Sequence, residues 1–346
     1  MEILSVTLPR PDDFHLHLRD GAAMADVLAH SARQFARAVV MPNLKPPVRT
    51  TGEALAYRDR IQAALPRESH FQPLMTLYLT EATTADEIAR ARDSGAIIGV
   101  KLYPAGATTN ADDGVVDLAQ ARTALEAMQQ EDLPLLIHGE VTDSTIDVFD
   151  REAVFVDRVL EPLRRDFPAL RMVLEHVTTQ HAVEYVQAAE RGLAATITPQ
   201  HLLYNRNALF AGGLQPHYYC LPLLKLESDR QALIAAATGG DRRFFLGTDS
   251  APHPRCAKEA ACGCAGIYSA HAALELYAEV FEQAGALDRL ADFASRNGAD
   301  FYGLPRNEGT VRLIKQALPI PASYPFGNDE VIPLRAGDTL TWRLTE

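Results

Sequence analysis

Short apolar runs that end in polar residues recur along the chain, and longer amphipathic segments separate them. The runs span residues 12–17, 36–41, 71–79, 97–102, 134–138, 171–176, 193–198 and 244–248. Several are almost continuously apolar, as in Leu135-Leu136-Ile137, which is typical of strands buried on both faces of a parallel sheet. The pattern therefore predicts eight parallel strands.

The segments between these runs carry apolar residues at helical spacing. Helices are predicted over residues 52–65, 85–94, 118–130, 152–165, 180–191, 228–237, 269–283 and 288–297. Regular alternation of strand and helix indicates an α/β fold, and eight repeats favour a closed (β/α)8 barrel of the TIM type. An open, doubly wound sheet is the alternative that the pattern leaves.

The final segment, residues 305–346, has a different character. Residues 318–327 are rich in proline and turn-forming residues, and residues 340–344 alternate like a terminal strand. No linker or internal repeat interrupts the sequence. We therefore expect one barrel domain over residues 1–346, with residues 305–346 as a short C-terminal appendage.

Charge and hydropathy argue against several classes of partner. The chain has 45 acidic and 33 basic residues, a net charge of −12, and lacks a basic stripe interleaved with aromatic residues, so no nucleic-acid partner is expected. No run approaches the roughly 18 apolar residues of a membrane span, and the N-terminus lacks the basic and apolar regions of a secretory signal. We expect a cytoplasmic protein that does not contact membranes.

Three of the four cysteines, Cys256, Cys262 and Cys264, lie in one stretch, and Cys220 stands apart. The stretch is either a zinc–thiolate knot or a loop of reduced thiols near a pocket. Its spacing lacks the paired C-x2-C pattern of zinc ribbons. Both interpretations stand at this point.

Two histidines close the first predicted strand, and further polar candidates follow later strands. His15 and His17 are two residues apart, so an extended backbone projects both imidazoles from one face, where they can bind a transition metal together. The C-terminal strand ends of a (β/α)8 barrel converge on one mouth, where active sites lie. Six candidates at such ends indicate a metal-dependent catalytic site, the other four being Lys101, His138, His176 and Asp249.

Four motifs extend this set: residues 10–21 around HLHLR, residues 41–43 (MPN), residues 99–104 (GVKLYP) and residues 247–253 (GTDSAPH). With them the chain resembles the amidohydrolase superfamily and, more narrowly, dihydroorotases of the short bacterial class, over about residues 9–303. The resemblance implies a metal-dependent cyclic amide hydrolase that interconverts dihydroorotate and N-carbamoyl-L-aspartate in pyrimidine biosynthesis. It also implies a homodimer.

The resemblance further implies two divalent metal ions bridged by an N6-carboxylated Lys101. Zinc is the ion that a majority of imidazole ligands favours. Burial and neighbouring cations favour the neutral amine that Lys101 needs to take up carbon dioxide. Asp249 would also carry a proton during catalysis. The implied ligands are His15, His17 and Asp249 for one ion and His138 and His176 for the other.

Contacts with the small, anionic substrate follow from the same resemblance. Arg19 would grip its carboxylate through two hydrogen bonds, and residues 104–114 would form a lid. One alternative is a hydantoinase-like or allantoinase-like hydrolase, whose substrates lack the ring carboxylate. Another is a non-catalytic scaffold, against which the complete ligand set argues. The implied substrate contacts are Arg19, Asn43, Thr108, Thr109, Leu221, His253 and Ala265.

Overall fold

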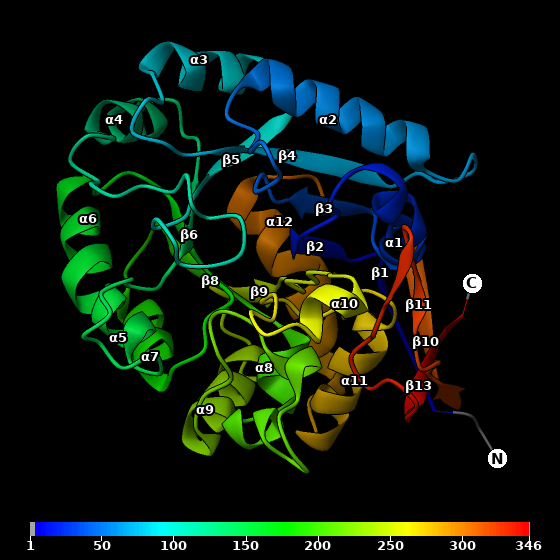
Figure 1. Ribbon diagram of the computed structural model, residues 1–346. Helices are drawn as coiled ribbons and strands as arrows, with labels where there is room; N and C mark the ends of the chain where they lie inside the picture. The colour runs from blue at the N-terminus through cyan, green and yellow to red at the C-terminus, as the bar shows by residue number, and fades with distance from the viewer. Residues whose placement is uncertain (1–3, 346) are drawn as a thin grey trace.

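The computed structural model describes residues 4–345, and its main feature is an eight-stranded parallel sheet rolled into a barrel (Figure 1). At the seam, the Asp249 amide donates to the His15 carbonyl (2.9 Å) and the His17 amide to the Ser250 carbonyl (3.1 Å). The predicted barrel is confirmed, and the open doubly wound sheet is excluded. The strands neighbour one another in chain order: β2 (Asp12–Leu16), β3 (Arg37–Val40), β4 (Gln72–Tyr78), β5 (Ile97–Leu102), β6 (Leu135–His138), β7 (Met172–Glu175), β8 (Leu193–Ile197) and β9 (Phe244–Leu246).

Helices surround the barrel, and most lie where the sequence predicts them. The helix predicted over 118–130 begins only at Arg122, and the one predicted over 180–191 ends at Ala188. The first helix, α1, was not predicted. The α-helices are α1 (Gly21–Gln34), α2 (Thr51–Ala64), α3 (Ala85–Asp93), α4 (Arg122–Gln130), α5 (Arg151–Phe155), α6 (Glu161–Asp166), α7 (Gln180–Ala188), α8 (Pro199–Leu203), α9 (Glu227–Thr238), α10 (Arg255–Lys258), α11 (Ala273–Gln283) and α12 (Asn297–Tyr302).

Two irregular stretches modify the predicted helices. A single π-helical turn, Val156–Leu160, joins α5 to α6, so the helix predicted over 152–165 is continuous but not uniform. The helix predicted over 288–297 is a 3₁₀ turn (Leu287–Arg289) and a π-helical turn (Asp292–Arg296) that lead into α12. These turns change hydrogen-bond spacing locally without changing the order of elements.

Apolar side chains fill the barrel interior at the N-terminal ends of the strands. Phe14 and Phe245 pack edge to face at 5.1 Å, and Phe14 stacks on Tyr302 of α12 at 5.2 Å. Gly298 allows this close approach of α12, because a Cβ there would overlap the Phe14 ring. The interior is therefore a packed core at the N-terminal end, and polar side chains gather at the C-terminal mouth.

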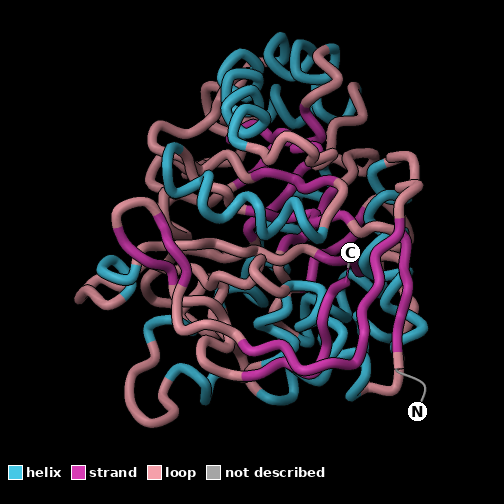
Figure 2. The backbone as a smooth tube through the Cα atoms, turned by 90° about the vertical axis from the view of Figure 1, so that its right-hand side faces the viewer, coloured by secondary structure: helices cyan, strands magenta, loops and turns pink. Residues whose placement is uncertain are grey.

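The C-terminal segment forms two small antiparallel sheets. The predicted terminal strand is present as β13 (Thr339–Thr345), and β10 (Thr310–Pro319) pairs with it. β10 also pairs with β1 (Ser5–Pro9), so the first and last strands of the chain lie in one sheet on one flank (Figure 2). The second sheet contains β11 (Tyr324–Phe326) and β12 (Asp329–Val331). Within residues 4–345, no helix has the length and apolar character needed to cross a membrane.

Candidate active site

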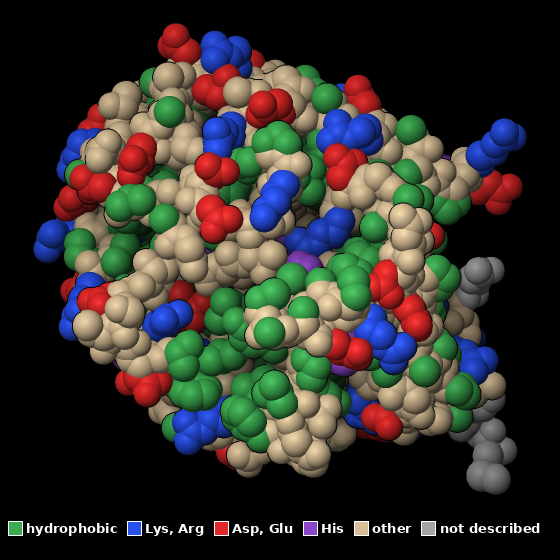
Figure 3. All heavy atoms as spheres, in the orientation of Figure 1, with side chains coloured by type: hydrophobic (Ala, Val, Ile, Leu, Met, Phe, Trp, Pro, Cys, Tyr) green, Lys and Arg blue, Asp and Glu red, His purple; other side chains and the backbone are tan. Residues whose placement is uncertain are grey.

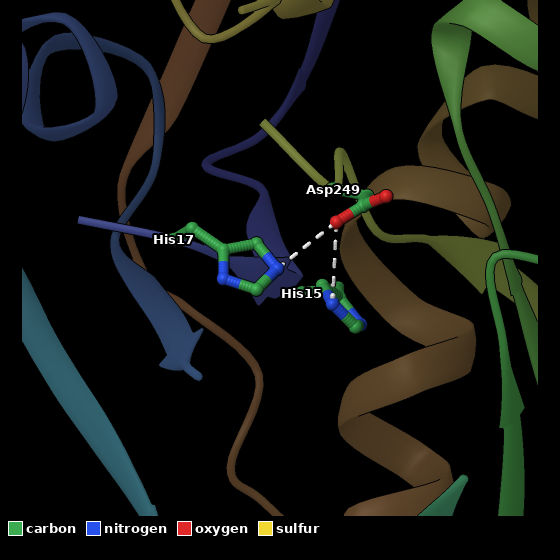
Figure 4. Close-up of side chains that lie close together, drawn as sticks. All are labelled: His15, His17 and Asp249. Carbon is green, nitrogen blue, oxygen red and sulfur yellow. Dashed lines mark ion pairs between the residues drawn. The ribbon is translucent and has the colours of Figure 1, made fainter. Parts of the chain in front are cut away.

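The first predicted ligand group lies at the junction of β2 and β9. Asp249 Oδ1 is 3.1 Å from His17 Nε2 and 3.4 Å from His15 Nε2 (Figure 4). One ligand atom from each of the three residues lies within 4.8 Å of the others, and all three residues are buried. This group can hold a metal ion.

The other predicted ligands lie beside this group. The imidazole of His176 is 5.0 Å from that of His15 and 4.8 Å from that of His138, measured between ring centroids. Lys101 is fully buried, and its charge lowers the pKa of His15 and His176 in addition to the larger effect of burial. The structure thus brings together all six residues that the sequence singled out at strand ends.

Carboxylate and amide groups orient three of the four imidazoles. Glu175 Oε2 accepts from His15 Nδ1 at 2.8 Å, and Asn43 Oδ1 accepts from His17 Nδ1 at 2.9 Å. These contacts leave Nε2 of both histidines for a metal ion. Glu140 Oε2 accepts from His138 Nε2 at 2.8 Å, which leaves Nδ1. Partners of this kind fix the tautomer and direction of a metal-binding histidine.

Sequence reasoning missed Glu140 and Glu175. Glu140 carried a signal, because it follows His138 by two residues in His138-Gly139-Glu140. Val173 belongs to the barrel-interior cluster, so strand alternation directs Glu175 inward as well. His176 reaches the site because the backbone leaves the strand there with φ of 42°.

Asp13 is a further site-building residue that the sequence did not reveal. Its carboxylate accepts from the Thr248 amide (2.9 Å), the Thr248 hydroxyl (2.6 Å) and the His15 amide (3.1 Å). Burial raises the pKa of Asp13 to about 7, and the Thr248 hydrogen bonds oppose that rise. Asp13 thereby fastens the end of β9 against β2, which fixes the position of Asp249 relative to His15.

Backbone strain concentrates at this mouth. Arg19, His176 and Asp249 have φ of 62°, 42° and 45°, and Asn110 in the predicted lid has φ of 60°. Residues other than glycine rarely adopt this left-handed conformation, and such strain is often found at functional sites. The surrounding contacts must therefore hold these side chains in place.

Burial also sets the protonation of the site. It lowers the pKa of His15 and lowers that of His17 and His176 well below the ordinary value. The three imidazoles are therefore neutral at neutral pH, which is the form that binds metals. Burial raises the pKa of Asp249, while His15 and Lys101 oppose the rise.

The predicted carboxylate contacts form a second group. Arg19 donates from Nε to the Pro252 carbonyl (2.9 Å), and its terminal nitrogen lies 2.9 Å from His253 Nε2. Burial and the Arg19 charge lower the pKa of His253, which is therefore a neutral imidazole beside a guanidinium. Asn43, the third predicted contact, binds His17 and also donates from Nδ2 to the Thr109 carbonyl at 3.2 Å.

Residues from both groups, the predicted metal ligands and the predicted carboxylate contacts, line one cavity. Its volume is about 20 Å³, room for about one water molecule. Thr109 closes it on one side by donating from its hydroxyl to the Ala265 carbonyl at 3.3 Å. Figure 3 shows a hollow on this face, with basic and histidine side chains inside it. Lys101 and His253 do not line the cavity. The predicted residues that do are His15, His17, Arg19, Asn43, Thr108, Thr109, His138, His176, Leu221, Asp249 and Ala265.

The cysteine loop is not a metal knot. Cys256 and Cys262 are exposed and Cys264 is half-buried. The one group of three or more potential metal-binding histidine, cysteine or acidic side chains within residues 4–345 is that of His15, His17 and Asp249. The cysteines are free and form no metal-binding group there, which favours the interpretation as a loop of thiols near the pocket.

Comparison with known sequences shows the family to which the chain is similar. The family model described as Amidohydrolase family matches residues 13–320. A dihydroorotase of Nitrosococcus oceani is 64% identical over 344 residues, which cover 99% of this chain and 100% of that protein. A dihydroorotase of Ralstonia nicotianae is 63% identical, and the match covers 98% of each chain.

Solved structures give the same result. A dihydroorotase of Campylobacter jejuni has a TM-score of 0.92 at 36% identity, and the match covers 100% of this chain and 99% of that one. The Saccharomyces cerevisiae dihydroorotase in complex with 5-fluoroorotic acid has a TM-score of 0.91 at 36% identity, with 99% and 98% covered. The match to an L-hydantoinase of Arthrobacter aurescens (16% identity, TM-score 0.80, 97% and 82% covered) supports the fold alone.

The hydantoinase-like alternative has no comparable support. The similarity to dihydroorotases extends along the whole chain, and His15, His17 and Asp249 lie within reach of one metal ion. The chain therefore belongs to the amidohydrolase family and, within it, to the dihydroorotases, which hydrolyse a cyclic amide in pyrimidine biosynthesis.

Proposed function

We propose that the chain holds two divalent metal ions, most consistent with zinc, and that a carboxylated Lys101 bridges them. One observation carries this proposal: within residues 4–345, buried His176 Nδ1 and Lys101 Nζ have no hydrogen-bond partner, and buried His15 Nε2 makes none either, although Asp249 Oδ1 lies 3.4 Å away. A buried polar atom left unsatisfied costs about 1–3 kcal/mol. Three such atoms in one mouth fit metal coordination. The ligands would be His15, His17 and Asp249 for one ion and His138 and His176 for the other.

Lys101 has the properties that a carbamate bridge requires. Burial lowers the pKa of Lys101 to about 8, so its neutral amine is accessible near neutral pH. The Nζ lone pair would attack the carbon of carbon dioxide, form an N–C bond and release one proton. The product is an anion with two oxygen atoms, whereas the unmodified ammonium would repel a divalent ion.

Asp249 would act as the proton carrier of the reaction. Divalent ions at this site would lower the pKa of a water molecule and polarise a carbonyl group. The Asp249 carboxylate would take the proton of the attacking water and return it to the departing ring nitrogen.

Metal content and protein mass test the bridge directly. Elemental analysis of the purified protein should give about two ions per chain, because the ligand set exceeds what one tetrahedral ion takes. Mass measurement under non-denaturing conditions should show the mass of one bound carbon dioxide, which acid should remove. Full activity with one ion and an unmodified Lys101 would rule out the bridge.

Arg19, Asn43 and His253 would read the substrate carboxylate, and Leu221 and Ala265 would contact the ring edge. Arg19→Met should lower kcat/KM for dihydroorotate about 10–150-fold, because this factor corresponds to the free energy lost with one charge-assisted hydrogen bond. Steady-state kinetics should show little extra loss on dihydrouracil, which lacks the carboxylate.

Arg60→Met is the matched control for Arg19→Met. Arg60 pairs with Asp20 at 2.7 Å on the exposed rim, and such pairs contribute little. We expect kcat/KM to change less than about threefold in this variant, because the pair is solvated. Equal losses of Arg19→Met on dihydroorotate and dihydrouracil would make Arg19 a structural residue.

Residues 104–114 would act as a lid that opens to admit substrate. Contacts that fasten the lid include Thr109 to Ala265, Asn110 Nδ2 to the Asn43 carbonyl at 3.1 Å and the ion pair of Arg49 with Asp113 at 3.0 Å. Substrate entry requires these contacts to break, since the closed cavity holds about one water molecule. The Thr108 and Thr109 hydroxyls would then hydrogen-bond the bound substrate and exclude water.

Thr109→Gly should lower kcat without changing metal content, because it removes the hydroxyl that closes the lid. Thr145→Gly, on an exposed loop, should leave kcat unchanged. Limited proteolysis with and without orotate checks the motion: the ligand should protect residues 104–114. Absence of protection by saturating orotate would mean that the segment is an ordinary surface loop.

The homodimer is proposed on the resemblance to dihydroorotases alone. Light scattering of the purified protein would test it, and a mass equal to that of one chain at all concentrations would exclude it.

A further inference from the structure

Lys258, the last residue of helix α10, is buried behind the proposed substrate pocket. It is 3% exposed. Its Nζ donates hydrogen bonds of 2.8 Å each to the backbone carbonyls of Tyr219, Cys264 and Gly266. An ammonium group has three protons, so every proton of Lys258 binds a carbonyl oxygen and none binds a carboxylate.

A buried cation is costly when its partners are backbone carbonyls and an aromatic ring, here Tyr219 with its centroid 5.6 Å from Nζ, and include no hydrogen-bonded carboxylate. Burial lowers the pKa of Lys258 to about 8, which reflects that cost. A methionine of similar length would fill the same space without it. The charge is therefore best explained by the three hydrogen bonds to carbonyls, which hold the backbone segments that carry these carbonyls in place.

Two of these carbonyls flank Ala265. Lys258 draws the Cys264 and Gly266 carbonyls to one side, so the Ala265 carbonyl between them faces the opposite side, toward the pocket. There it lies 3.3 Å from the Thr109 hydroxyl and 3.0 Å from His253 Nε2.

The third carbonyl belongs to Tyr219, two residues before Leu221. The Tyr219 carbonyl also accepts from the Gly266 amide at 3.0 Å. Lys258 therefore joins the two backbone segments that carry Leu221 and Ala265, and α10 adds a further tie because the Cys264 amide donates to the Ala257 carbonyl at 3.2 Å.

We infer that Lys258 is a positioning residue that aims the Ala265 carbonyl and the Leu221 backbone at the ring edge of the substrate. A carbonyl oxygen accepts only from a donor, so the group it would recognise is an N–H of the cyclic amide ring. The inference rests on the proposed substrate contacts of Leu221 and Ala265. It gives a role to a lysine that touches neither the substrate nor the metal ligands.

The test compares Lys258→Met with Lys225→Met. Lys225 is a matched control because it is 5% exposed and donates to one backbone carbonyl, that of Leu223 at 3.0 Å, outside the Ala265 segment. Lys258→Met should raise KM for dihydroorotate and Kd for orotate about tenfold, the loss of one well-placed hydrogen bond. The kcat should stay within about threefold, because this contact forms equally in ground and transition states.

Metal content should equal that of the wild type in both variants, and Lys225→Met should keep wild-type KM. An unchanged KM in Lys258→Met, or an equal rise in both variants, would overturn the inference. If Lys258→Met does not fold, Lys258→Gln replaces it: its amide keeps two donors, so a smaller rise in KM is expected and no rise overturns the inference. Wild-type protein that hydrolyses dihydroorotate but does not bind orotate would instead overturn the proposed ring contacts.

Discussion

Replacing Lys101 by alanine is expected to remove the bound metal and the activity together. Loss of a residue that only supports a ligand costs about 10–100-fold in metal affinity or activity, and loss of a bridging ligand should cost more. The side chain is fully buried, and its charge lowers the pKa of three predicted histidine ligands, so it lies among them; these are His15, His17 and His176. Elemental analysis and steady-state kinetics on the same preparation check the result.

One further variant and one rescue experiment separate ligation by Lys101 from packing. Lys101→Met fills the space over Tyr103, whose ring centroid lies 5.0 Å from Nζ, but cannot take up carbon dioxide. It should therefore behave like Lys101→Ala. A short carboxylate such as acetate can enter the alanine variant and should restore part of the metal content. Retention of metal by Lys101→Met would show that the bridge is wrong.

The sequence was sufficient for the barrel and for the positions of the candidate ligands. Strands buried on both faces are short apolar runs, and a residue that ends such a run lies at the mouth of a barrel by topology alone. His138, the final residue of β6, and Lys101 in β5 follow from this rule. The rule needs no knowledge of which strands pair, because strand order in the barrel equals chain order.

The same rule does not show which residues orient the ligands, because it does not pair residues from distant strands. Glu175 meets His15 across 160 positions of sequence, and Asp13 meets Thr248 across 235. Such contacts depend on closure of the barrel. The end of a buried strand places Glu175 at the mouth, but nothing in the local sequence shows that its partner is His15. The left-handed φ of His176 and Asp249 is equally invisible, because neither residue type favours that conformation strongly enough to predict it.

Pairing between distant segments also explains why the sequence does not predict strands β1 and β10. β1 pairs with β10 across almost the whole length of the chain, with Ser5 opposite Ile314, so the residues next to either strand in sequence do not define it.

Helix α1 also was missed, although it directly follows the ligand motif and Asp20 caps it by accepting from the Gly21 amide at 2.9 Å. Asp20 is thus a helix start signal that sequence reasoning missed.

Replacing Asp249 by asparagine is expected to lower kcat about 10²–10⁴-fold, the usual contribution of a positioned proton carrier. Asparagine keeps an oxygen near His15 and His17 but cannot take a proton at neutral pH. Metal content should therefore fall less than activity. Asp20→Asn is the control, because Asp20 is exposed at the same mouth and pairs with Arg60; its kcat should stay within about twofold, as for other surface pairs.

The pH dependence of the wild type gives the second measurement on Asp249, because its sign depends on the direction of the reaction. Hydrolysis needs the carboxylate, so its rate should rise with pH through one apparent pKa that belongs to Asp249 and the attacking water together. Ring closure needs the protonated form, so its rate should fall over the same range. Asp249→Asn should remove the pH dependence of both rates, and Asp20→Asn should keep the pH dependence of both. If Asp249→Asn keeps its metal, most of its kcat and the wild-type pH profile, another group carries the proton.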